Sequence, residues 1–182
     1  MTSYAPFARS LRKPCSGAAR YASSGHTLLV ENIKQEVLAM LALLPLAPED
    51  KLPTGATAEQ VQHLQKYFGL PLPSQLVEWL SFCNGPCVAQ GGVFGVRPDR
   101  KFLDVINHVE ENSTWRQNLW LPIAGDGCGN YYVLSLDSSN PEVCPVFFID
   151  HEVDHDELSH QVAPDLWHFL HWLFKDDLRR IK

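Results

Sequence analysis

Histidines and cysteines whose spacing could hold a metal ion fall in two places along the chain. His151 and His155 are four residues apart, a spacing that on a helix would present both imidazoles to one ion. Residues 150–156, however, contain a single apolar residue, which favours a solvated loop. Cys83 and Cys87 have three residues between them, but no second Cys or His pair stands at zinc-finger spacing. The sequence therefore predicts neither a metal site nor a cofactor.

Residues that could act in catalysis are present, but none stands in a catalytic context. A nucleophilic enzyme needs a Ser or Cys held by a base that is itself oriented. The chain has no Gly-x-Ser-x-Gly elbow, and the carboxylates of residues 150–157 form a charge run of the kind that usually faces solvent. We therefore predict no catalytic residues. An enzyme is the less favoured alternative, because triads are defined by geometry that a sequence does not display.

Residues 125–130 read Gly-Asp-Gly-Cys-Gly-Asn, the most distinctive local run in the chain. A glycine-rich turn can hold phosphate when a helix follows and directs its N-terminus at the anion. Here residues 131–136 are aromatic and aliphatic with a β-branched member, which indicates a strand, and the run has no P-loop lysine. A hairpin or bulge turn is the prediction, with phosphate binding as the alternative.

Charge is unevenly distributed along the chain. The net charge is −6, yet residues 117–174 contain no Lys or Arg and nine acids. Such a surface repels nucleic acid and anionic lipid and attracts a cationic partner. The alternative is that the acids only keep the protein soluble.

The tryptophans are candidate anchors for a protein interface, where this residue type is enriched. They are Trp79, Trp115, Trp120, Trp167 and Trp172. Trp79 and Trp167 lie at helical spacing among apolar neighbours, so we expect both in the core, as we do Leu80.

Hydrophobic periodicity indicates the elements that must position these residues. The expected helices cover residues 28–44, 57–69, 74–82, 102–111 and 164–180, and the expected strands cover 91–96, 119–124, 131–136 and 143–149. Thr57 with Gln60 fits a capping box for the second helix, and Ser74 is the expected cap of the third. This order predicts an α+β fold with N-terminal helices, a mostly antiparallel sheet and a C-terminal helix.

The first 25 residues differ in composition from the rest. They carry four bases and no acid, and they lack apolar periodicity. We expect a disordered basic tail over residues 1–25, with an organelle transit peptide as the alternative, and one domain over residues 26–182. No apolar run reaches the ~18 residues that span a bilayer. The five scattered cysteines do not form a disulfide framework, so we expect a soluble, cytoplasmic protein.

Two signatures follow one another along the chain. The first is a helix that ends in Leu-Pro, a helix that ends in Asn-Gly and a glycine-bounded strand, at residues 57–73, 76–85 and 92–96. The second is an apolar strand, a glycine-rich turn with Asp or Asn, and a strand that ends in Leu-Asp, at residues 121–124, 125–130 and 131–137. A strand at 145–149 and a closing helix complete the order. In this order and spacing, residues 56–174 resemble the SUKH superfamily, which includes Smi/Knr-like regulators and bacterial immunity proteins.

The resemblance implies a non-catalytic protein-binding domain. The first implied role is an immunity protein that binds and neutralises a cationic toxin, since a nuclease must be cationic to hold phosphate. The alternative is a regulatory or scaffold protein of Smi/Knr type in signalling or cell-wall synthesis. No nucleic acid or membrane partner is expected. Together with the stretch that lacks bases, the resemblance implies these partner-binding residues: Asp150, Glu152, Asp154, Asp156, Glu157, Trp120, Tyr131 and Tyr132.

Overall fold

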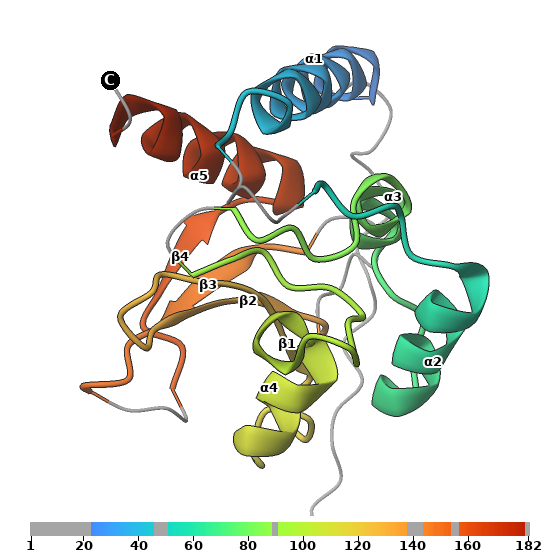
Figure 1. Cartoon of the computed structure of the whole chain (residues 1–182), viewed down its shortest axis with the longest axis vertical. Helices are drawn as coiled ribbons and strands as arrows, with labels where there is room; N and C mark the ends of the chain where they lie inside the picture. The colour runs from blue at the N-terminus through green and yellow to red at the C-terminus, as the bar shows by residue number, and fades with distance from the viewer. Residues whose placement is uncertain (1–22, 46–50, 89–90, 138–143, 154–156, 181–182) are drawn as a thin grey trace, which may run out of the picture.

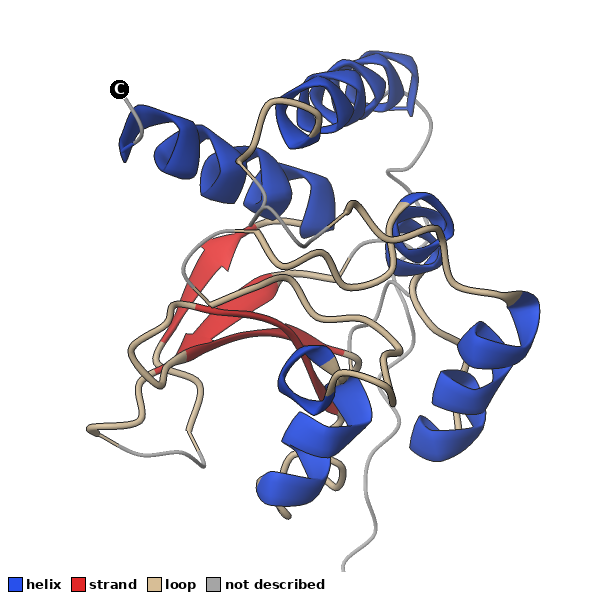
Figure 2. Ribbon diagram, in the orientation of Figure 1, coloured by secondary structure: helices blue, strands red, loops and turns tan. Residues whose placement is uncertain are grey.

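A four-stranded antiparallel sheet lies between the helices (Figure 1 and Figure 2). The structure, a computed structural model, describes residues 23–45, 51–88, 91–137, 144–153 and 157–180. The strands stand in chain order across the sheet: β1 (Trp120–Gly125), β2 (Tyr131–Ser135), β3 (Val146–Ile149) and β4 (His160–Ala163). Each is antiparallel to the next, which confirms the predicted sheet.

Helices cover both faces of this sheet. In the described part of the chain they are α1 (Ser23–Leu41), α2 (Ala58–Phe68), α3 (Ser74–Phe82), α4 (Val105–Glu111) and α5 (Leu166–Arg180). Helix α5 lies on one face and α4 on the other, and α1 packs on the outer side of α5 (Figure 1). Helices precede the sheet and a helix closes the chain, so the predicted α+β class is confirmed.

The predicted capping box forms at the start of α2. The N–H of Gln60 donates to the Thr57 hydroxyl at 3.2 Å, and the N–H of Thr57 donates to the Gln60 side chain at 2.8 Å. Gly69 ends the helix in the left-handed conformation, at φ 75°. Glycine suits this position because a β-carbon would be strained there.

Two helix predictions need correction. Pro73, not Ser74, is the N-cap of α3, and no side chain caps that helix. The Pro73 carbonyl accepts the first helical hydrogen bonds, so Ser74 is already inside the helix. The helix predicted over residues 102–111 is a 3₁₀ turn (Lys101–Leu103) followed by α4, because Asp104 adopts an extended backbone and caps α4 through Asn107 N–H.

The strand predictions also need correction. The strand predicted over residues 91–96 is reduced to two isolated bridges, Val93 with Ala124 and Gly95 with Asp104, because the segment changes partner within two residues. Strand β4 was not predicted, because its first two residues are exposed and polar and give no apolar run. Helix α1 begins and ends earlier than the predicted range of 28–44, because Ser and Gly at its start hide the helix from a hydrophobic pattern.

The core confirms the expected buried residues. Trp79, Leu80 and Trp167 are each 1% exposed. Trp79 contacts Trp167 edge to face and also Phe174, which joins α3 to α5. Of the described helices, none is both long and apolar enough to cross a membrane.

Candidate functional site

The loops after β1 and β3 emerge side by side at one end of the sheet. The strand register pairs Gly125 with Tyr131, and Tyr131 with Ile149. Asp126 follows the first of these strands and Asp150 follows the other. Two acids that are distant in sequence are therefore brought to the same end of the sheet.

The β3–β4 connection adds further acids at this end. Glu152 and Glu157 are both exposed, and β4 begins beside the end of β3, where His160 pairs with Phe148. The predicted residues Asp154 and Asp156 lie outside the described residues. We call the described group the acidic end: Asp126, Asp150, Glu152 and Glu157.

Hydrogen bonds tie the turn at 125–130 to the β3–β4 connection. Asp126 Oδ1 accepts from the backbone N–H groups of Cys128 at 2.7 Å and Asn130 at 3.1 Å. Asn130 Oδ1 accepts from the His151 N–H at 3.0 Å and lies 2.7 Å from His151 Nδ1. At Gly129, φ 102°, an added β-carbon would lie 3.2 Å from that imidazole. The predicted hairpin turn is confirmed, and this network holds the acidic end together.

The three predicted aromatic residues do not lie together on one surface. Tyr131 and Tyr132 are consecutive on β2, so their side chains lie on opposite faces of the sheet. Tyr131 packs against Trp115, with ring centroids 4.9 Å apart, whereas Tyr132 packs against Phe169 of α5 at the same distance. Trp120 is half-buried at the other end of β1.

A small cavity adjoins the acidic end where the β1–β2 turn meets the last turns of α5. Its volume is about 160 Å³. We call it the Trp172 pocket, and its lining residues are Gly125, Asp126, Tyr132, Trp172, Leu173, Asp176, Asp177 and Arg180. The Trp172 and Tyr132 rings meet edge to face at 5.8 Å, which gives the pocket an aromatic wall.

The electrostatics of the pocket act on the phenol of Tyr132. Burial raises the pKa of Tyr132, Asp126 raises it further, Arg180 lowers it, and Asp176 raises it. Arg180 forms a 2.7 Å ion pair with Asp176 one helical turn earlier, and both side chains are substantially exposed. Carboxylates thus outweigh the single guanidinium that lines the pocket.

Trp172 is the tryptophan that the structure leaves open to a partner. Trp79, Trp115 and Trp167 are buried, and Trp120 is half-buried, whereas Trp172 is 45% exposed. Trp172 was one of the five candidate anchors, but the predicted partner-binding residues did not include it, Asp176 or Asp177. The spacing of Trp172, Asp176 and Arg180 at four-residue steps would have placed them on one face of the predicted helix.

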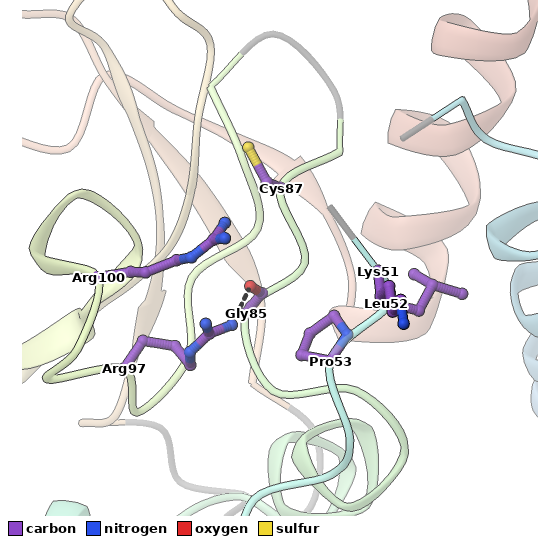
Figure 3. Close-up of a pocket in the computed structure, with 7 residues that line it drawn as sticks. All are labelled: Lys51, Leu52, Pro53, Gly85, Cys87, Arg97 and Arg100. Atoms are coloured by element: carbon purple, nitrogen blue, oxygen red, sulfur yellow. Dashed lines mark hydrogen bonds between the residues drawn. The ribbon is translucent and has the colours of Figure 1, made fainter. Parts of the chain in front are cut away.

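A second cavity, of about 270 Å³, has cationic side chains and no acidic ones in its lining (Figure 3). It is lined by Lys51, Leu52, Pro53, Gly85, Cys87, Arg97 and Arg100. Arg97 donates from Nη1 to the carbonyls of Asn84 and Gly85, at 3.2 and 3.3 Å. Its Nε and Nη2 atoms donate to Asp99 at 3.1 and 3.0 Å. The guanidinium of Arg97 is therefore balanced by a carboxylate and holds the Asn-Gly corner after α3.

The histidines and cysteines of the described residues have structural surroundings. Within the described ranges, no cluster of three or more His, Cys, Asp or Glu residues could hold a metal ion. Cys83 is buried, and burial raises the pKa of its thiol to about 12, which favours the protonated thiol at neutral pH. His108 is stacked on Phe94 at 4.1 Å, with Nε2 3.1 Å from the Phe102 carbonyl and Nδ1 3.4 Å from the Tyr131 hydroxyl.

Comparison with known proteins gives one family. The family model of the SMI1 / KNR4 family (SUKH-1) matches residues 55–172, a span that runs from just before α2 into α5 and includes half of the residues lining the Trp172 pocket. A search of curated proteins found no match.

Proposed function

Because the chain belongs to the SMI1 / KNR4 family (SUKH-1), we propose that it is a non-catalytic, cytoplasmic protein-binding domain. Its proposed role is that of an immunity protein, which binds and neutralises a cationic toxin. The observation that carries this proposal is the convergence of Asp126, Asp150, Glu152 and Glu157 at one end of the sheet. The surrounding stretch, residues 117–174, supplies no Lys or Arg to neutralise them.

The physical role of the acidic end is to attract and orient the partner. Charges at the rim of an interface mainly raise the association rate and contribute only about 0–1 kcal/mol each to affinity. A nuclease toxin presents basic side chains that bind phosphate, and the carboxylates at this end of the sheet can form ion pairs with the same side chains. Tight binding then needs a desolvated aromatic contact, for which Trp172 is the exposed candidate.

The test starts with affinity capture of the partner from the native host and its identification by mass spectrometry. Binding kinetics with that purified partner are then measured at low and moderate salt for a variant that combines Glu152→Gln and Glu157→Gln. Asp150 is left intact because its carboxylate accepts the N–H of Glu152 and shapes the turn. We expect a lower association rate with a weaker salt dependence, and little change in the dissociation rate.

The matched control combines Glu31→Gln and Glu59→Gln, which remove the same charge from exposed positions on α1 and α2. An association rate at low salt that equals the control's would contradict the proposed docking end. The alternative role, a regulatory or scaffold protein of Smi/Knr type, is distinguished by the captured partner. A toxin encoded beside this gene supports the immunity role, and a signalling or wall-synthesis protein supports the regulator.

A further inference from the structure

A third cavity, of about 200 Å³, lies between α4 and the glycine-rich turn at 125–130. Its lining includes the rings of Phe94, Phe102, His108 and Tyr131. Phe94 and His108 stack with their centroids 4.1 Å apart, and Tyr131 meets His108 edge to face at 5.4 Å. We call this cavity the Phe102 pocket.

Phe102 is the open part of this aromatic lining. Its ring is 57% exposed, whereas Phe94 is 3% and His108 is 8% exposed. The backbone of Phe102 is nevertheless fixed, because it lies in the 3₁₀ turn before α4 and its carbonyl is 3.1 Å from His108 Nε2. An exposed apolar ring beside a concave site is typical of an interaction surface.

The glycine-rich turn lines the pocket without side chains. Gly127 and Gly129 need to be glycine for their backbone, at φ 79° and φ 102°. Gly125 also lines the pocket but is not in that conformation. A β-carbon added at Gly125 would lie 3.4 Å from both the Gly91 carbonyl oxygen and Phe94 Cζ. Glycine at position 125 therefore keeps space open beside the Phe94 ring.

The lining determines the kind of group that fits. Among the described residues that line the pocket, none is Lys, Arg, Asp or Glu. The Tyr131 hydroxyl lies 3.4 Å from His108 Nδ1, so these two polar groups have each other as partners. A charged group would lose its water here without gaining an opposite charge. Aromatic rings favour a further ring, edge to face or offset, and an apolar cavity of about 150 Å³ is enough for one benzene ring.

The pocket is continuous with the acidic end. Asp126 lies between two of the lining glycines, and Asn130 also lines the pocket. Asn130 Oδ1 accepts the N–H of His151, which stands between Asp150 and Glu152 in the chain. A cationic protein attracted to these carboxylates is therefore brought to the edge of the pocket. Aromatic side chains are enriched among the anchors that fill such pockets.

We propose that the Phe102 pocket receives an aromatic side chain of the cationic partner, an inference that rests on the proposed function. The partner's ring packs against Phe102 beside the glycine-rich turn, while basic residues around it pair with the acidic end. The acidic end then sets how fast the partner associates, and the pocket sets how slowly it leaves.

The first test uses the free full-length protein and two small probes. N-acetyltyrosine amide and N-acetylleucine amide are each titrated into the protein, and binding is followed by the amide signals in NMR spectra. We expect ring-current shifts at the N–H groups of Gly127 and Gly129, and an affinity for the tyrosine probe about threefold above that for the leucine probe. Equal affinities, or no shift at the turn, would overturn the inference.

Two variants change the pocket without changing charge. Phe102→Ala removes the open ring, and Gly125→Ala places a methyl group beside Phe94. Each should weaken binding of the tyrosine probe about threefold. Phe82→Ala is the matched control, because Phe82 is 46% exposed on α3 and does not line the pocket. Melting temperatures are recorded for all three, and Phe102→Ala decides the test if Gly125→Ala does not fold.

The second test uses the captured partner and separates this inference from the steering role of the acidic end. Phe102→Ala should raise the dissociation rate about tenfold and leave the association rate at low salt unchanged. A dissociation rate equal to that of Phe82→Ala would reject the pocket, whatever the Glu152 and Glu157 substitutions do. Faster dissociation in Phe102→Ala, with normal association in the glutamate variant, would retain the pocket and reject the steering role.

Discussion

At the scale of single residues, Trp79 and Trp172 show how one residue type takes two roles. Trp79 is 1% exposed and packs between Trp167 and Phe174. Trp172 lies on the same helix as Trp167, five residues on, and is 45% exposed. Trp167 is buried and Trp172 is exposed because they are five residues apart on one helix, and such a step turns the second side chain well away from the face of the first.

The first prediction concerns this pair. Trp79→Ala should lower the free energy of unfolding by ~3–5 kcal/mol, through lost burial and a cavity. Trp79→Phe should cost less, since it keeps an aromatic ring at this site and removes an indole N–H that has no partner in the described part of the chain. Trp172→Ala is the control and should cost only about 1 kcal/mol. A loss below about 1 kcal/mol for Trp79→Ala in denaturant melts would contradict the packing seen here.

At the scale of elements, α1 lies outside the matched family span but is integrated into the fold. Val37 is fully buried and Leu41 is 6% exposed, both in the main core cluster. Lys34 forms an ion pair with Glu78 of α3, and Glu36 lies 2.8 Å from His171 of α5. The helix therefore bridges α3 and α5 instead of extending from the domain.

The second prediction separates the first residues from α1. The sequence predicts that residues 1–24 are dispensable, and because α1 begins at Ser23 the cut belongs before that residue. Deletion of residues 1–22 should change the free energy of unfolding by less than about 0.5 kcal/mol. Deletion of residues 1–41 should cost at least ~3 kcal/mol, since buried aliphatic side chains contribute ~1.5–3 kcal/mol each. Melting curves of the two variants check this, and a large loss from the shorter deletion would refute it.

At the scale of the whole molecule, one apolar cluster joins the helices to the sheet. It includes Val37 of α1, Leu64 of α2, Trp79 of α3, Val133 of β2 and Phe169 of α5. Because these residues share a core, α1 and the sheet should not unfold separately.

The third prediction is therefore a single cooperative transition. Val37→Ala in α1 and Val133→Ala in β2 should lower the midpoint of the same denaturant transition, with far-ultraviolet circular dichroism and tryptophan fluorescence still coincident. Each should cost on the order of 1–3 kcal/mol, since both side chains are fully buried. Two separated transitions in either variant would show that α1 is an independent unit.

The sequence by itself determined the features that depend on local patterns. The capping box of Thr57 and Gln60 and the burial of Trp79 follow from residue types at short spacing, and both are confirmed. The order of the elements was enough to predict the α+β class and to indicate the family that the comparison found.

Only the tertiary structure decided which distant residues share a surface. Strand β4 escaped prediction because a polar edge strand has no apolar pattern, yet its pairing with β3 puts Glu157 and Asp150 at the same end of the sheet. The Trp172 pocket joins the turn at 125–130 to a helix that begins some forty residues later. Strand alternation sent Tyr131 and Tyr132 to opposite faces, so just one of these two predicted aromatics reaches the pocket. Register and packing set these placements, because they depend on contacts that no local run of residues contains.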